Sequence, residues 1–301
     1  MGREPKACLL PLTVVACLLP LFAERHASAA QIDLPVPNIP GMNMQTAKYG
    51  DKYWQSFTFL SPRRAVPVPV VIRIEGIPYD QPSEPPSLSF LPSFLYENGI
   101  AYVVVRGRPK GKGLGSEQTQ DLARAIGEIA RNPAKYRIDP TRIVLTGAGL
   151  EAQSALLLAT DPAWLSQVGV PFDSLRAAVS VDGEPFDIPQ WMAAGGKYRT
   201  GKYDKLFGTA PGEQLRLSPA RQVAPPNAPR FLFFVSQGKE QTLSQAHKMA
   251  SALAQNGAAA EVVPISRKQR DVAATYIGAP QHQQTPKLLA VLRQAFQQTE
   301  R

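Results

Sequence analysis

Two patterns of apolar residues alternate along this chain. Short runs of consecutive apolar residues, such as AYVVVRG at 101–107, are typical of strands that are buried on both faces of a sheet. Longer segments such as residues 116–136 carry apolar residues at every third or fourth position, a spacing typical of amphipathic helices. Because the two patterns alternate, we expect the chain to consist of repeated strand–helix units.

These units extend over most of the chain. Strands are expected over 55–62, 67–76, 101–107, 142–147, 177–183, 230–238 and 260–266. Helices are expected over 86–99, 116–136, 150–160, 243–257 and 285–298. We expect residues 55–62 to form an edge strand, and residues 184–222, rich in glycine, proline and aromatic residues, to form a long excursion rather than a clean helix. The pattern predicts an α/β fold with a mainly parallel, doubly wound sheet and helices on both faces. Ligands of such sheets bind at the carboxyl ends of the strands.

The first 30 residues have the features of a secretory signal peptide. Arg3 and Lys6 precede the apolar run ACLLPLTVVACLLPLF, which is shorter than the roughly 20 residues that span a membrane. Small residues at 27–29 then form a cleavage pattern. We therefore expect an exported protein, periplasmic or secreted. In an alternative interpretation, VVAC is a lipoprotein signal and Cys17 carries a lipid anchor.

The rest of the chain is expected to form one domain. Residues 31–47 are proline-rich and without period, which predicts an extended N-terminal arm. Residues 48–301 are expected to form the α/β domain. The composition, 44% hydrophobic and 19% charged, is that of a globular protein with a sizeable core. The sequence does not indicate an oligomeric state.

Cysteine and histidine usage excludes several kinds of site. The only cysteines are Cys8 and Cys17, so a chain cleaved after residue 29 or 30 contains no thiol, and disulfides and thiolate metal sites are excluded. His247 and His282 are the histidines beyond the signal, and they do not form a metal-ligand pair at helical spacing. We expect no metal and no cofactor.

The formal net charge of +9 raises the question of an anionic partner. The lysines and arginines are scattered, and no basic helix with interleaved aromatic residues occurs, so we expect no nucleic-acid binding. A basic envelope- or polyanion-binding module remains one alternative function.

One segment resembles a known family. IDPTRIVLTGAGLEAQSALLLATDP, at 138–162, resembles the nucleophile-elbow region of esterases and lipases of the α/β-hydrolase fold, in particular the feruloyl-esterase-like and kynurenine-formamidase-like carboxylesterases. The stretches at 48–62, 67–76, 217–238 and 276–292 resemble other segments of that family in the same order. The resemblance covers roughly residues 48–298 and implies the α/β-hydrolase fold.

The same resemblance implies that the catalytic machinery is degenerate. The family's nucleophilic serine aligns with Gly149, and its histidine base aligns at or near Arg270. The family's next elbow glycine is Glu151 here. The His-Gly-Gly turn that supplies an oxyanion-hole amide corresponds to Glu75, Gly76 and Ile77. The family's acid position falls near Glu240.

We therefore expect a non-catalytic pseudo-hydrolase that acts as a binding or scaffold protein. A small acyl or aromatic ligand in the old cleft would contact residues at the strand ends, namely Glu75, Gly76, Ile77, Gly149, Leu150, Glu151 and Asp182. The alternative enzyme is a carboxylic ester hydrolase with a relocated nucleophile or base, for which Ser154 and His282 are the candidates.

Overall fold

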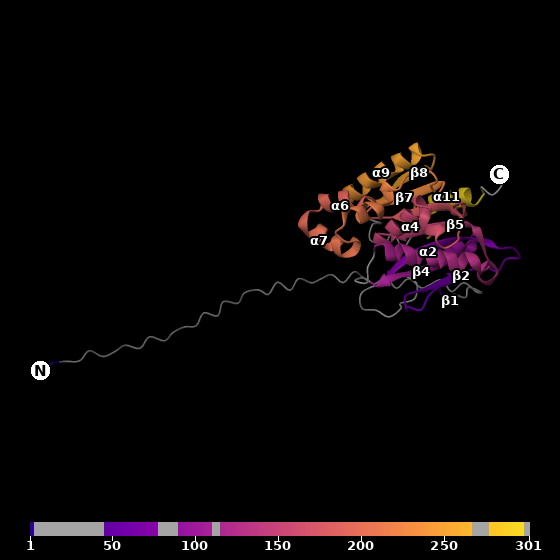
Figure 1. The fold of residues 1–301 in the computed structure, drawn as a ribbon, viewed down its shortest axis with the longest axis horizontal. Coiled ribbons are helices and arrows are strands. Elements are labelled where there is room, and N and C mark those ends of the chain that lie inside the picture. Colours follow the sequence, from indigo (N-terminus) through magenta and orange to yellow (C-terminus); the bar gives the residue numbers. More distant parts are fainter. Residues whose placement is uncertain (3–44, 78–89, 110–114, 267–276, 298–301) are drawn as a thin grey trace. The chain divides into compact units, whose positions relative to one another are not determined.

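A computed structural model describes residues 1–2, 45–77, 90–109, 115–266 and 277–297. Most of the expected signal peptide, Cys17, most of the N-terminal arm and Arg270 lie outside these ranges. Residues 45–297 contain one sheet of eight strands in the order β1-β2-β4-β3-β5-β6-β7-β8 (Figure 1). The strands are β1 Gln45–Lys48, β2 Ser56–Leu60, β3 Val68–Ile77, β4 Ala101–Pro109, β5 Ile138–Ala148, β6 Leu175–Val181, β7 Arg230–Ser236 and β8 Ala259–Ile265.

The sheet is mainly parallel, as the apolar runs predict. β4, β3, β5, β6, β7 and β8 pair in parallel, whereas β1 and β2 are antiparallel to their neighbours. The prediction of an edge strand at 55–62 is wrong. All five residues of β2 are buried, and β1 covers the edge that β2 would otherwise expose. β1 includes the last residues of the segment expected as an arm.

Helices follow the expected ranges in most places. They are α1 Leu91–Glu97, α2 Ser116–Arg131, α3 Pro133–Tyr136, α4 Leu150–Thr160, α5 Ala163–Ser166, α9 Glu240–Gln255 and α11 Thr285–Gln297. The helix expected over 116–136 is interrupted at Asn132, because Pro133 cannot donate a backbone hydrogen bond and instead begins α3. No helix among the described residues is long and apolar enough to cross a membrane.

The excursion at 184–222 is more helical than expected. It contains α6 Ile188–Ala194, α7 Gly196–Phe207 and α8 Pro211–Arg216. Proline lies in the first turn of α6 and α8, where its missing N–H costs nothing, and Gly208 ends α7 with a φ of 73°. Glycine and proline therefore separate short helices here rather than preventing helix formation.

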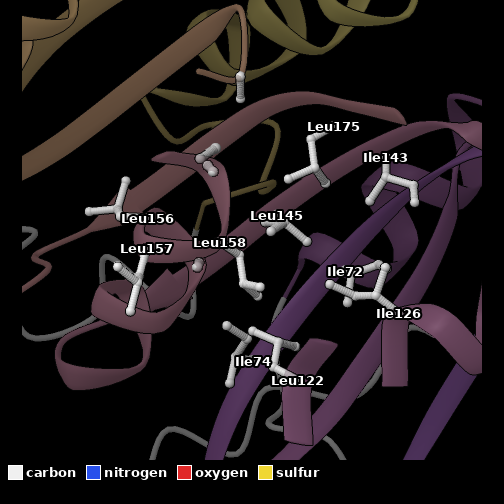
Figure 2. Close-up of a cluster of buried hydrophobic side chains, with 14 of the residues drawn as sticks. Ile72, Ile74, Leu122, Ile126, Ile143, Leu145, Leu156, Leu157, Leu158 and Leu175 are labelled. Carbon is white, nitrogen blue, oxygen red and sulfur yellow. The ribbon is translucent and has the colours of Figure 1, made fainter. Parts of the chain in front are cut away.

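Two apolar layers cover the two faces of the sheet. The larger layer packs α2, α4 and α9 on one face, and the smaller layer packs α1 and α11 on the other. Figure 2 shows part of the larger layer, where Ile72 and Ile74 of β3 lie near Leu122 of α2 and Leu158 of α4. Nine of the 11 residues of α4 are buried, which explains why this helix is apolar on all sides. This arrangement confirms the doubly wound α/β fold.

A buried carboxylate ties the antiparallel strands to the rest of the domain. Asp121 of α2 is 3% exposed. Its oxygens accept hydrogen bonds from Arg108 Nε at 2.8 Å, Gln55 Nε2 at 3.0 Å and Trp54 Nε1 at 3.3 Å. Burial, and then the charge of Asp121, raise the pKa of the nearby Tyr49 phenol. One side chain therefore joins the segment before β2, the end of β4 and α2.

Candidate functional site

The site begins at the turn between β5 and α4. β5 ends at Ala148, α4 begins at Leu150, and Gly149 lies between them with φ 56° and ψ −127°. Side-chain-bearing residues rarely adopt this conformation, so it is a sharp, strained strand-to-helix turn. The Gly149 N–H donates to the Val181 carbonyl at 3.1 Å, and the Gly149 carbonyl accepts from the Glu184 N–H at 3.1 Å. The turn after β6 therefore holds the peptide groups of Gly149 in place.

The tip of this turn faces open space. A Cβ atom built on Gly149 would meet no atom within 4 Å. The position has the geometry and the room to present a side chain, and it presents none. Gly149 therefore lacks a nucleophile because of its residue type, and steric crowding is not the reason.

Gly147 has a different role in the same turn. A Cβ atom on Gly147 would lie 2.7 Å from the backbone N of Ala152 and 2.7 Å from the backbone C and O of Glu151. β5 and α4 pass so closely here that only glycine fits. Glycine at this position is required by the crossing of strand and helix, whether or not a nucleophile follows.

The Glu151 side chain lies against the end of β3. A Cβ atom on Gly76 would overlap Glu151 Oε1 and lie 3.0 Å from Glu151 Cδ. The pairing of β3 with β4 is irregular between Glu75 and Ile77, so Gly76 lies in a local bulge. The carboxylate of Glu151 and the bare backbone of Gly76 are therefore complementary. This contact joins two of the positions that the sequence predicts at the site.

Asp182 has structural partners. It follows β6 with φ 49°, and its two carboxylate oxygens accept from the Ser236 N–H and the Ser236 Oγ–H, both at 2.6 Å. Lys239 Nζ lies 3.7 Å from Asp182 Oδ2. These contacts fasten the end of β6 to the end of β7. Leu150, another of the expected binding residues, is half-buried and packs against the larger apolar layer.

The candidates for a relocated mechanism are placed unfavourably. Ser154 is fully buried within α4, and its hydroxyl donates to Gln153 Oε1 at 3.2 Å. His247 is exposed on α9, and Glu240 is exposed as the first residue of that helix. His282 lies in the segment before α11 and is 4% exposed. No group of three or more His, Cys, Asp or Glu side chains in the described part of the chain could hold a metal ion.

A narrow crevice lies beneath the turn, on the face of the sheet covered by α1 and α11. Thr146, Gly147 and Ala148 of β5 line it together with Arg73 of β3. Its other walls are apolar side chains from the smaller layer: Val71, Leu91, Leu95, Val144, Val179, Val181, Ile277, Leu288 and Leu292. Arg73 was not among the site residues expected from the sequence. The feature that could have indicated it is the presence of a charge inside the otherwise apolar run VVIRI.

The electrostatics of this face centre on β3 and β4. Tyr102 of β4 is buried, and burial raises the pKa of its phenol to about 12, which the positive charge of Arg73 opposes. The negative charge of Glu75 raises the same pKa further. Arg73 and Glu75 therefore put opposite charges beside Tyr102, at the ends of strands whose neighbouring side chains are apolar.

No protein-family model and no curated protein matches the sequence. Solved structures do match the fold. Esterase B from Lactobacillus rhamnosis aligns with a TM-score of 0.64 at 16% identity over 85% of each chain. A putative carboxylesterase from Lactobacillus plantarum aligns with a TM-score of 0.64 at 16% identity, covering 84% of this chain and 99% of that one. An esterase from Thermogutta terrifontis aligns with a TM-score of 0.61 at 15% identity, covering 86% and 92%.

The protein therefore has the α/β-hydrolase fold, as the resemblance of residues 138–162 implied. In this fold the turn after the fifth strand carries the catalytic serine. The oxyanion hole is formed by the N–H of the following residue and an N–H from the loop after the third strand. The corresponding groups here are Gly149 at the tip, the Leu150 N–H, and the end of β3 at Gly76, where the Glu151 carboxylate lies.

His282 makes stability depend on pH. Its Nδ1 accepts from the Gln284 N–H at 3.2 Å, and its Nε2 has no hydrogen-bond partner among the described residues. Burial lowers the pKa of this imidazole below its ordinary value of 6.5. Below that pH the unfolded chain binds a proton that the folded chain resists, so the free energy of unfolding falls as pH decreases.

We expect urea denaturation at pH 5.5 and 7.5 to show a smaller loss of stability at the lower pH in His282→Gln than in wild type. The exposed His247→Gln variant is the control, and an equal loss in all three proteins would contradict this account.

Proposed function

We propose that this protein is an exported, non-hydrolytic protein of the α/β-hydrolase fold that binds a small acyl or aromatic acid at the strand ends. The observation that carries the proposal is the turn at Gly149, which keeps the strained geometry and the free space of a nucleophile position but carries no side chain. Export rests on the signal-like features of residues 1–30.

The contact of Glu151 with Gly76 supports the loss of hydrolysis independently. Ester hydrolysis by this fold develops a negative oxygen beside the Leu150 N–H and the end of β3. The Glu151 carboxylate lies against Gly76 at the end of β3. A negative charge near the developing oxygen would repel it, so Glu151 would raise the energy of the intermediate that an oxyanion hole has to stabilise.

Burial of Ser154 argues against a relocated nucleophile. Its hydroxyl is enclosed within α4 and bonded to the neighbouring Gln153, so an ester carbonyl could not approach it without opening the core. A hydrolase that used Ser154 would also need a base within hydrogen-bond reach. In the described structure, the partner of the Ser154 hydroxyl is a glutamine rather than a base.

The crevice beneath the turn supplies the lining chemistry for the binding part of the proposal. Its walls are apolar except for Thr146 and Arg73, and its volume of about 20 Å³ holds little more than one water molecule, so α1 and α11 would have to move apart to admit a short acyl chain or an aromatic ring. The guanidinium of Arg73 would pair with the carboxylate of such a ligand. A protein without a nucleophile would hold such an acid without changing it chemically.

The test uses a fluorophosphonate carrying a fluorophore, with an active serine esterase as positive control. We expect neither wild type nor Ser154→Ala to be labelled, and neither to hydrolyse p-nitrophenyl butyrate above a heat-denatured control. On the same preparation, saturation-transfer NMR with sodium benzoate is expected to detect binding that Arg73→Met weakens about tenfold. Stoichiometric labelling of wild type would overturn the non-hydrolytic assignment. Absence of benzoate binding would leave a scaffold and overturn the ligand assignment.

A further inference from the structure

A second concavity lies at the opposite end of β5 from the Gly149 turn. Arg63 and Ser61, beyond the end of β2, line it together with Lys135 and Tyr136 of α3 and Arg137, which precedes β5. Gln45 and Phe59 complete the lining. Its volume of about 390 Å³ is in the range of small-ligand sites. This concavity is separate from the crevice beneath the Gly149 turn and has its own chemistry.

Three cations meet in this concavity without an acidic neighbour in its lining. Arg63, Lys135 and Arg137 are all exposed, and no ion pair between any of them and an acidic side chain occurs in the described part of the chain. Nearby carboxylates are engaged elsewhere. Asp139 binds Arg142 and Thr141, and this bonding lowers its pKa although partial burial opposes the change. Three like charges in one hollow repel each other, and a multivalent anion would relieve that repulsion.

The backbone under these cations is held in a strained conformation. Arg137 has φ 55° and ψ 39°, a left-handed conformation that a residue other than glycine adopts at a cost of about 1 kcal/mol or more. Its carbonyl accepts from the Val68 N–H at 3.3 Å and from the Ser61 hydroxyl at 3.3 Å. Its N–H donates to the Pro133 carbonyl. The backbone of Arg137 is therefore fixed by three segments, which sets where its side chain leaves the chain.

Tyr136 forms a rigid wall beside the cations. It is 1% exposed, and its hydroxyl donates to Glu128 Oε1 at 3.1 Å. Lys135 Nζ lies 5.1 Å from the centre of the Tyr136 ring, so the ammonium is positioned over an aromatic face. Because Tyr136 and Phe59 are buried, neither offers an exposed ring on which nucleic-acid bases could stack.

We propose that this concavity binds the phosphate group of a phosphorylated ligand. Two guanidinium groups and one ammonium complement a tetrahedral anion of charge −2 or more, and a single carboxylate would leave part of their charge unpaired. The side-chain amide of Gln45, also in the lining, adds a neutral donor. The concavity lies away from the Gly149 turn, so this inference does not depend on the proposed function.

Calorimetric titration of the full chain with sodium pyrophosphate at low salt tests the proposal. A triple variant, Arg63→Gln, Lys135→Gln and Arg137→Gln, is expected to bind at least tenfold more weakly than wild type. The matched control removes the same number of charges at exposed positions outside the lining, through Arg64→Gln, Lys205→Gln and Lys248→Gln, and is expected to change affinity less than twofold. Raising the salt concentration should weaken wild-type binding.

A single variant separates binding from folding. Arg137→Gly removes one charge from the concavity, and glycine adopts a φ of 55° without strain. It is expected to weaken pyrophosphate binding several-fold while the melting temperature stays equal or rises.

Co-sedimentation with phosphatidylcholine vesicles containing phosphatidylglycerol forms a second arm of the same test. Loss of binding in the concavity variants in either arm supports the site, and the arm that responds identifies a soluble or a lipid-borne phosphate. Equal losses in the two triple variants, or absence of wild-type binding to both probes at millimolar phosphate, would overturn the proposal.

Discussion

Gly147→Ala is expected to lower the free energy of unfolding by about 3 kcal/mol. The added Cβ would lie 2.7 Å from backbone atoms of Glu151 and Ala152, at the point where β5 crosses α4. Backbone atoms cannot rotate away as the end of a flexible side chain can. The helix would have to move off the strand, and α4 is the most deeply buried helix of the larger layer. Urea denaturation followed by circular dichroism measures the change.

Gly149→Ala is the matched control for this prediction, since it makes the same chemical change two residues away. A Cβ at Gly149 meets no atom within 4 Å, so only the strain of φ 56° and ψ −127° remains, at about 1–2 kcal/mol. If the two variants lost equal stability, the close strand–helix crossing would not be the reason for glycine at Gly147.

Asp121→Ala is expected to cost about 3–5 kcal/mol, because it leaves the half-buried Arg108 and the donors of Gln55 and Trp54 without their shared acceptor. The loss should also loosen β2 and the residues before it, which hydrogen exchange of the β2 amides would detect. Chemical denaturation gives the size of the effect.

Glu117→Ala is the control for Asp121→Ala. Glu117 belongs to the same helix and faces the same arginine, with 3.8 Å between Arg108 Nη1 and Glu117 Oε2, but its side chain is 56% exposed. Removing it is expected to cost less than about 0.5 kcal/mol. Equal effects of the two substitutions would show that burial of Asp121 is not what makes its contacts strong.

The two glycines explain how the turn persists without a nucleophile. Gly147 is required by the packing of β5 against α4, and Val181 and Glu184 hold the peptide groups of Gly149. None of these interactions involves a serine hydroxyl. The turn at Gly149 is therefore held by backbone packing and hydrogen bonds that do not depend on a catalytic side chain. This is why its presence alone does not establish hydrolysis.

Glu151 bears on the proposed absence of hydrolysis. Glycine at Gly76 leaves room that the Glu151 carboxylate fills. In the proposed non-hydrolytic protein, the missing side chain at Gly149 opposes the attack, and the Glu151 carboxylate opposes stabilisation of the oxyanion.

The pattern of apolar residues by itself determined the α/β class and the parallel strands, because strands buried on both faces leave unbroken apolar runs, and the sequence also placed α4 at Leu150–Thr160 after the glycine turn. Residue types alone also established that Gly149 carries no nucleophile. Short elements without an apolar pattern were harder to predict from the sequence. β1 is short and largely exposed, so its four residues have no apolar signal.

Only the tertiary structure decided what the charged residues do. Asp182 binds Ser236 of the neighbouring strand, and Glu151 reaches Gly76 across 75 positions of sequence. Arg63, Lys135 and Arg137 meet in one hollow because β2, α3 and β5 adjoin in space, although the sequence shows only scattered cations. Strand and helix formation depends on neighbouring residues and can be read along the chain. The pairing of charges depends on which distant segments the sheet brings together, and for that the strand order is needed.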